Sequence, residues 1–311
     1  MTTTNAASSG LQRELEAGRF VITAEVSPPV STDPADFIAR ALPLRGLATA
    51  VNVTDGAGAK AHLSSLVASH FLVQNGIEPI LQFTCRDRNR IALQADLIGA
   101  AALGIRNLLI LGGDDPKNGD QPETKAVFDL NSAGLLAMAH RMRTEQALPP
   151  GTEIKGGFDL VIGGADLPID PPPEWDPKAL RSKADAGADF IQTQFCMDID
   201  IVRLYAARLL ELGIAQRLPI LIGVAPMPSV RSGRWMKEKL FGTIIPDSLI
   251  ARLEGAADPK AEGLAICVEL VQQLAQIPGI AGAHIMAPTF PSAVPEVIRQ
   301  SQVVGKPRAA V

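Results

Sequence analysis

Cysteine, aromatic residues and net charge are all scarce in this sequence of 311 residues. The three cysteines, Cys85, Cys196 and Cys267, are odd in number and have no CxxC spacing, which argues against a disulfide framework and a zinc site. We interpret them as small buried side chains of a protein in a reducing compartment. Aromatic residues are 4% of the chain, too few for a base-stacking platform. The net charge of −4 argues against the concentrated basic surface of a nucleic-acid-binding protein.

Long apolar runs are also missing, so the sequence predicts no membrane span. Residues 1–10 are rich in Thr, Ser and Ala and lack the positive and apolar regions of a secretory signal. We therefore predict a disordered lead over residues 1–12, one catalytic domain over residues 13–311 and a cytoplasmic location. Hydrophobic residues make up 47% and charged residues 20% of the chain, as in soluble globular enzymes.

Short apolar runs alternate along the chain with longer helical patterns. The strand candidates are Phe20–Val26, Ala50–Thr54, Pro79–Thr84, Asn107–Leu111, Phe158–Ile162, Asp189–Thr193, Pro219–Val224 and Gly282–Met286. The helix candidates are Asp33–Arg45, Ala61–Asn75, Asn89–Leu103, Leu130–Arg143, Pro177–Ala186, Ile201–Leu212, a long stretch near Ser232–Ile277, and Val294–Gln302. Strict alternation predicts a parallel sheet, and eight units predict a single-domain α/β fold closed into a (β/α)8 TIM barrel.

A doubly wound open sheet is the rival fold. It usually carries a phosphate-binding GxGxxG after the first strand, where this chain has Ser27-Pro28-Pro29. A proline-rich stretch over residues 168–177 falls within a strand-to-helix loop, so we interpret it as an active-site loop and not as a linker. The strand ends carry no lysine, which argues against an aldolase that forms a Schiff base.

Polar residues at the carboxyl ends of the strands are the candidates for chemistry, because barrel enzymes place their sites there. Glu25 stands within an apolar strand, where a lone carboxylate is costly unless it is paired or protonated. Burial raises a carboxyl pKa, which suits a general acid near neutral pH. The structural alternative is a glutamate bonded to a loop or an arginine at the strand exit.

Asp114 follows Gly112 and Gly113, and glycines let backbone approach a flat or phosphorylated ligand. The alternative is a simple turn at Asp115-Pro116.

Gln192 and Gln194 share one face of their strand, and their amides suit the edge of a pterin ring. Hydrogen bonds inside the barrel are the structural alternative. We interpret His284 as a structural histidine, and because no second His or Cys stands at ligand spacing, we predict no metal. A basic run over residues 231–239 either meets a phosphate or glutamate tail or forms a solvated helix face.

Taken together, the strand-end segments resemble the methylenetetrahydrofolate reductase family. They are TAEVSPP (residues 23–29), NVTDGAGA (52–59), QFTCRD (82–87), LGGDDP (111–116), KADAGADFIQTQFCMD (183–198) and GVAP (223–226). Each is weak alone, but together they follow the family's order from Phe20 to Met286. The resemblance implies a flavin-bearing barrel that reduces 5,10-methylenetetrahydrofolate to 5-methyltetrahydrofolate. FAD would take a hydride from NAD(P)H as co-substrate and pass it to the folate.

The resemblance also implies residue roles. Glu25 would be the acid that opens the imidazolidine ring to an iminium, and Asp114 would lie near the flavin and the pterin. Gln194 would contact the folate substrate, with Gln192 and Phe195 beside it. The positions expected to hold FAD are Thr54, Asp55, Gln82, Gly112, Gly113, Asp114, Ala165, Asp176 and Lys183.

This sequence departs from the family pattern at several FAD positions. Gly112 stands where an arginine is usual, Asp55 where a tyrosine is usual, and Ala179 and Ser182 replace polar contacts. These losses remove charge and hydrogen bonds near the diphosphate and ribose, and they leave open a flavin-free variant in which the nicotinamide transfers hydride directly. A folate-dependent methyltransferase, a non-catalytic folate-binding subunit and a homo-oligomer also stay open, as does the choice between NADH and NADPH.

Overall fold

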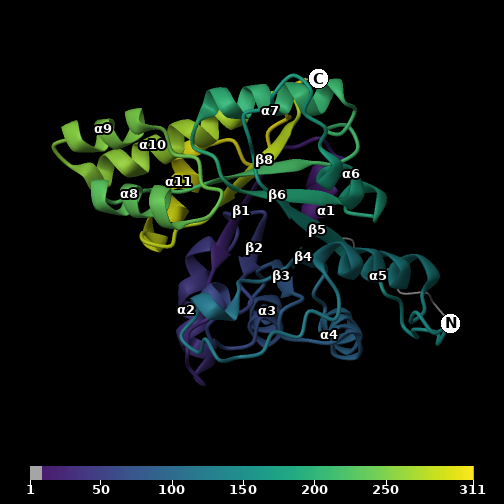
Figure 1. Ribbon diagram of the computed structural model, residues 1–311. Coiled ribbons are helices and arrows are strands. Elements are labelled where there is room, and N and C mark those ends of the chain that lie inside the picture. Colours follow the sequence, from purple (N-terminus) through teal and green to yellow (C-terminus); the bar gives the residue numbers. More distant parts are fainter. Residues whose placement is uncertain (1–8, 311) are drawn as a thin grey trace.

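The computed structural model describes residues 9–310, and its centre is a closed barrel of parallel strands (Figure 1). Each strand pairs with the next in chain order, and β8 pairs with β1, so the predicted (β/α)8 barrel is confirmed. The strands are β1 Val21–Val26, β2 Ala50–Val53, β3 Pro79–Thr84, β4 Asn107–Leu111, β5 Val161–Asp166, β6 Phe190–Phe195, β7 Ile220–Val224 and β8 Ile280–Ile285.

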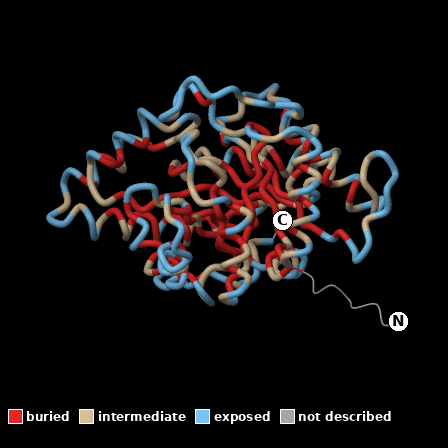
Figure 2. The backbone as a smooth tube through the Cα atoms, turned by 90° about the horizontal axis from the view of Figure 1, so that it is seen from below, coloured by how far each residue is buried: buried red, intermediate tan, exposed pale blue. Residues whose placement is uncertain are grey.

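Helices surround this barrel, and the first of them closes its amino end. They are α1 Gly10–Glu16, α2 Pro34–Ala41, α3 Ser65–Gln74, α4 Arg90–Ala102, α5 Ser132–Glu145, α6 Lys178–Asp185, α7 Ile199–Glu211, α8 Val230–Lys239, α9 Asp247–Gly255, α10 Pro259–Leu274 and α11 Val294–Ser301. Short 3-10 turns are η1 Leu42–Leu44, η2 Ala57–Ala59, η3 Pro116–Asn118 and η4 Pro291–Ala293. Seen at right angles, the buried residues gather in the centre of the molecule and the exposed ones at its margin (Figure 2).

Two predicted elements needed correction. The long helical stretch near residues 232–277 is three helices, because Gly242 adopts a left-handed φ of +73° after α8 and Asp258 caps a new helix that starts at Pro259. Strand β5 begins later than predicted and runs through Gly163 and Gly164. These glycines suggested the end of a strand. An added Cβ at Gly163 would lie 2.3 Å from the ring of Phe190, so this position within the strand has room only for glycine.

The predicted disordered lead was too long. Helix α1 begins within it, and Ser9 caps the helix by accepting a hydrogen bond from the Gln12 N–H at 3.1 Å. The Glu78 carboxylate accepts from the backbone N–H groups of Gly10 and Leu11 at 2.8 and 2.9 Å. Leu11 is fully buried in the apolar cluster at the amino end of the barrel. These contacts order residues 9–12, and residues 1–8 lie outside the described part of the chain.

The interior of the barrel is apolar at its amino end. Its cluster contains Leu11, Leu15, Val21, Ala50, Ile80, Leu109, Val161, Phe190, Leu221 and Ala281. These side chains close the cylinder from below, so a ligand can approach the interior only from the carboxyl ends of the strands.

The three cysteines are free and buried, as interpreted from the sequence. Burial raises the pKa of the Cys85 thiol to about 11 and that of Cys196 to about 12, so neither is a thiolate at neutral pH. Across residues 9–310, no helix is long and apolar enough to cross a membrane.

Replacing Gly163 by alanine should lower the free energy of unfolding by about 1–3 kcal/mol, because the fully buried Phe190 ring cannot move away from the new methyl group. Urea denaturation measures the change. Gly255→Ala is the matched control, since a Cβ there, in helix α9, meets no atom of the described chain within 4 Å. Equal stability of the two variants would contradict this account of the barrel interior.

Candidate active site

A layer of buried polar side chains lies inside the barrel above the apolar cluster. Asn52 on β2 and Gln192 on β6 exchange two amide hydrogen bonds, of 2.6 and 3.1 Å. Gln192 Nε2 also donates to Thr23 Oγ1 at 3.0 Å, and Thr23 Oγ1 shares a hydrogen bond with His284 Nδ1 at 2.9 Å. All four side chains are buried. Since the layer joins β1, β2, β6 and β8, it fixes these strands relative to one another.

Glu25 lies on the same face of β1 as Thr23, one layer nearer the mouth. Its Oε2 accepts a hydrogen bond from Gln82 Nε2 at 2.7 Å and lies 3.8 Å from His284 Nε2. Its Oε1 accepts no hydrogen bond from residues 9–310, and its side chain is 22% exposed. The carboxylate is therefore held by an amide and an imidazole, not by an arginine, and keeps one oxygen for a ligand.

The order of hydrogen bonds favours one form of His284. Thr23 Oγ1 accepts from Gln192, so its own proton can be donated to His284 Nδ1. A neutral His284 then carries its hydrogen on Nε2, which faces Glu25. The histidine that we interpreted as structural is thus also in electrostatic contact with the candidate acid.

Thr54 follows directly after β2 and carries a buried hydroxyl with no hydrogen-bond partner in the described chain. A buried hydroxyl without a partner is costly, and a ligand that pairs with it would remove that cost. Thr54 therefore keeps its place among the candidate contacts.

Asp55, in contrast, is saturated by its own protein. Its Oδ2 accepts from Arg88 at 2.6 Å and from both the N–H and the hydroxyl of Thr84 at 3.0 Å, and its Oδ1 accepts from Ser65 at 2.9 Å. Both carboxylate oxygens are thus used in joining the loops after β2 and β3. The structure gives Asp55 a structural role and leaves it no free oxygen for a cofactor.

Asp114 lies at the start of the loop after β4, beside a glycine pair. Its Oδ2 accepts from the Gly58 N–H at 2.7 Å, which joins the β4 and β2 loops. Gly113 has a φ of +96°, and a Cβ there would lie 2.9 Å from Arg86 Cβ, so this position requires glycine. At Gly112 an added Cβ would meet no atom of the described chain within 4 Å, so its outer side is open to a flat ligand.

The three residues predicted to bind folate from β6 do not lie together. Gln192 is fully used in the buried polar layer. Gln194 is nearer the mouth, where its Nε2 donates to the Phe241 carbonyl at 3.2 Å and its Oε1 accepts from the Phe195 N–H at 3.0 Å. The Phe195 ring is buried in the core between strands and helices, on the other face of the strand. The structure therefore does not bring Phe195 to the mouth.

The predicted cofactor residues after β5 are also bound internally. Lys183 Nζ donates to the Ala165 carbonyl at 2.5 Å and to Asp166 at 3.2 Å. The Tyr205 hydroxyl donates to the other oxygen of Asp166 at 2.8 Å, and burial raises the pKa of this tyrosine well above its usual value. Asp176 is half-exposed and lies 3.6 Å from Arg181. The ammonium of Lys183 is thus already paired.

FAD would bring both a flat ring and a negatively charged diphosphate to this mouth. Thr54 and the open surface of Gly112 suit a ring. A diphosphate is held best by cations or by the start of a helix, but Lys183 is paired with Asp166, and position 112 carries no side chain. The residues present therefore fit the ring but do not fit the diphosphate.

Comparison with known proteins fixes the family. The family model described as methylenetetrahydrofolate reductase matches residues 10–302. The chain belongs to the methylenetetrahydrofolate reductase family. Among its relatives are a probable methylenetetrahydrofolate reductase (NADPH) of Caenorhabditis elegans, 26% identical over 76% of this chain and 34% of that protein, and the 5,10-methylenetetrahydrofolate reductase of Pectobacterium carotovorum, 24% identical over 77% of this chain and 79% of that protein. The chain spans about a third to two fifths of the two relatives that it matches first.

A solved structure of another barrel protein agrees with this family fold. It is an uncharacterized protein from Clostridium thermocellum that binds two copies of 5-methyl-5,6,7,8-tetrahydrofolic acid. The TM-score is 0.64 and the identity 14%, with 94% of this chain and 97% of that chain covered. At this identity the likeness concerns the fold.

Sequence reasoning missed several residues of this family member's mouth. Thr23 and Asn52 looked like ordinary strand residues, although a polar residue at an inward position of a buried strand was the available signal. Tyr205 comes from helix α7 and Phe241 from the turn after α8, and neither sequence shows how its segment is placed against the barrel.

Asp55→Asn should lower the free energy of unfolding of this reductase-family barrel by about 1–3 kcal/mol, because a neutral amide removes the nearer of the two carboxylates that pair with Arg88 and cannot accept all four hydrogen bonds. Chemical denaturation provides the measurement. Asp185→Asn, which removes an exposed partner of Arg217, is the control and should change stability by no more than about 0.5 kcal/mol. Wild-type stability of Asp55→Asn would return Asp55 to the candidate ligands.

Proposed function

We propose that this chain reduces 5,10-methylenetetrahydrofolate to 5-methyltetrahydrofolate with NAD(P)H as the electron donor. The observation that carries the proposal is Glu25, a carboxyl group held over a buried polar layer at the barrel mouth with one oxygen left for a ligand. The family match supports the reaction. The folate bound by the Clostridium thermocellum protein supports a folate ligand for a barrel of this shape.

The first task of the site is to open the five-membered ring of the substrate. Glu25, in its protonated form, gives its proton to N10, the bond between N10 and the methylene carbon breaks, and an N5 iminium cation forms. Gln82 orients the carboxyl group through its amide, and His284 lies close enough to help exchange protons with it. The buried layer beneath allows these side chains little movement.

The second task is hydride transfer to the methylene carbon. NAD(P)H gives two electrons and a hydrogen to the iminium carbon and becomes NAD(P)+, and N5 becomes a neutral amine that carries a methyl group. The flat rings need a separation of roughly 3–3.5 Å, which the open surface at Gly112 allows. The Asp114 carboxylate beside that surface stabilises positive charge on the iminium.

FAD is the hydride carrier that the family resemblance implies, and the donor set at the mouth does not favour its diphosphate. Lys183 is paired and Gly112 lacks a charge, so direct transfer from the nicotinamide suits these residues better. The absorbance spectrum of the purified chain separates the two routes. A yellow protein that NADPH bleaches carries a flavin, and a colourless protein that still oxidises NAD(P)H with methylenetetrahydrofolate transfers hydride directly.

Two other functions differ from the reductase in their use of NAD(P)H. A folate-dependent methyltransferase or a non-catalytic folate-binding subunit would consume no NAD(P)H, whereas the reductase oxidises one NAD(P)H per methyltetrahydrofolate formed. A cytoplasmic location and a homo-oligomer remain predictions from the sequence.

Glu25→Gln should lower kcat for folate reduction by roughly 10²–10⁴-fold, because glutamine keeps the shape of the side chain but cannot donate the proton. Binding of 5-methyltetrahydrofolate, measured by calorimetry, should change little. Glu211→Gln, which alters an exposed carboxylate on α7, is the control and should keep full activity. Near-normal turnover by Glu25→Gln would remove Glu25 from the mechanism.

Gln194→Ala should weaken binding of 5-methyltetrahydrofolate by about tenfold, which corresponds to about 1.4 kcal/mol and to the loss of one or two hydrogen bonds with the pterin. Affinity for NADPH should stay near the wild-type value. Fluorescence titration with each ligand tests the contrast. Equal losses for both ligands would indicate that the variant disturbs the Phe241 loop and not a folate contact.

A further inference from the structure

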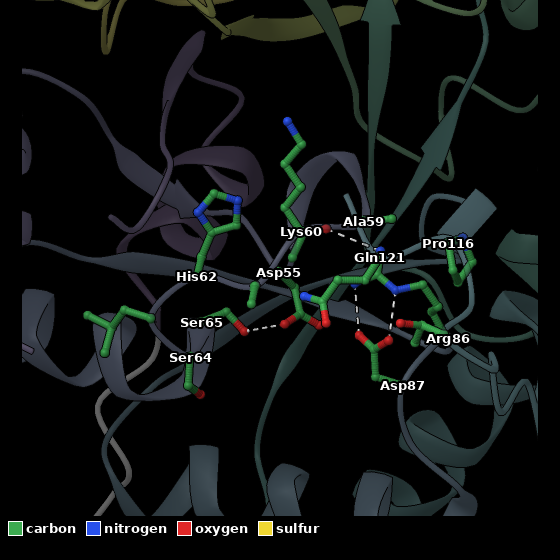
Figure 3. Close-up of a pocket in the computed structure, with 14 residues that line it drawn as sticks. Asp55, Ala59, Lys60, His62, Ser64, Ser65, Arg86, Asp87, Pro116 and Gln121 are labelled. Carbon is green, nitrogen blue, oxygen red and sulfur yellow. Dashed lines mark hydrogen bonds and ion pairs between the residues drawn. The ribbon is translucent and has the colours of Figure 1, made fainter. Parts of the chain in front are cut away.

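A cavity that the folate chemistry does not use lies beside the mouth. It has a volume of about 330 Å³ and lies among the loops that follow β2, β3 and β4 (Figure 3). The loop after β2 contributes most of its wall, including Lys60 and His62. Pro116 closes it from the loop after β4.

The charges around this cavity leave one cation without a partner. The carboxylate of Asp87 is held by two hydrogen bonds of 2.8 Å from Arg86, and Asp55 is held by Arg88 and Ser65. Lys60, in contrast, makes no hydrogen bond or ion pair with any residue from 9 to 310. Neutralised carboxylates and an unpaired ammonium give the cavity a preference for anions.

His62 and the start of helix α3 line the same cavity. No hydrogen bond joins the His62 ring to the described chain, and its Nδ1 atom is buried. Helix α3 begins at Ser65, and Ser64 before it makes no side-chain capping bond, so N–H groups of the first turn remain available. The positive end of a helix stabilises phosphate oxygens, and an imidazole and an ammonium add charge-assisted hydrogen bonds.

The wall of the cavity is rigid and continuous with the mouth. At Gly119 a Cβ would lie 2.3 Å from the Ala59 carbonyl oxygen, so the β4 loop packs directly on the β2 loop. Gly58, which stands between the lining residues Gly56 and Ala59 in the β2 loop, donates to Asp114 at the mouth. A ligand with its reacting ring above Gly112 can therefore extend over this wall into the cavity.

Other basic groups near the barrel are less suitable for an anion. Two cations of the basic run on α8 are paired, Lys237 with Asp247 at 2.6 Å and Arg234 with Glu254 at 2.5 Å. Apolar surface from Leu63 and Pro116 lies inside the cavity, and it suits the flat face of a base better than a lone carboxylate.

We propose that this cavity binds the phosphate-bearing adenosine half of NAD(P)H, with Lys60, His62 and the start of α3 holding phosphate oxygens. The inference rests on the proposed use of NAD(P)H and assigns that co-substrate a place. The adenine lies against Leu63 and Pro116, and the nicotinamide reaches the mouth over the Gly58 wall.

The test uses ADP as the probe, because its binding needs no turnover. ADP should bind the full chain in calorimetry and should compete with NADPH. Lys60→Ala and His62→Ala should each weaken ADP binding by about tenfold and raise KM for NADPH, with little change in KM for the folate. Lys155→Ala, which removes an exposed lysine that precedes β5, is the control of equal charge change and should leave ADP binding unaltered.

Three results would overturn the proposal: no binding of ADP, binding that Lys60→Ala and His62→Ala leave unchanged, or loss of p-aminobenzoylglutamate binding in these variants in place of ADP binding. The last result would assign the cavity to the glutamate tail of the folate. A chain that binds ADP through Lys60 but reduces no folate would support the site and contradict the proposed function. A chain that reduces folate normally but binds no ADP would support the proposed function and contradict the site.

Discussion

Hydrogen bonds among four buried side chains inside the barrel set the geometry of the mouth. Thr23, Asn52, Gln192 and His284 come from four strands, and each would be costly to bury without its partners. Because these side chains hydrogen-bond to one another, they hold the strands that carry them in one relative position. Glu25 stands directly above this layer, and its orientation depends on it.

The fold could be read from the sequence because a parallel barrel repeats one simple pattern. Buried parallel strands are continuous apolar runs, and the run Asn107–Leu111 was placed without error. The glycines after Ile162 led us to predict that the strand ends there, but Gly163 lies within β5 and makes room for the ring of Phe190. Helix α1 was missed because its order comes from Glu78, far away in the sequence, and not from its own composition.

The site could be predicted in part for the same reason. Strand ends meet at one rim, so a list of polar residues at those ends included Glu25, Asp114 and Gln194. The partners of such residues could not be predicted: Asp55 looked like a ligand contact, but Arg88 and Thr84 occupy its Oδ2 and Ser65 its Oδ1. The face of a strand that a residue occupies also depends on register.

The mouth is a preorganised site in which a fixed acid meets two flat ligands. Separate parts of the rim have separate tasks. The polar layer supports Glu25 from beneath, an open glycine surface lies beside Asp114, and a cavity lies behind it. A crystal structure with bound 5-methyltetrahydrofolate tests this most directly. We predict that a Glu25 oxygen lies within about 3.2 Å of N10, directly or through one water, with the pterin over Gly112. Folate bound away from Glu25 would contradict the account.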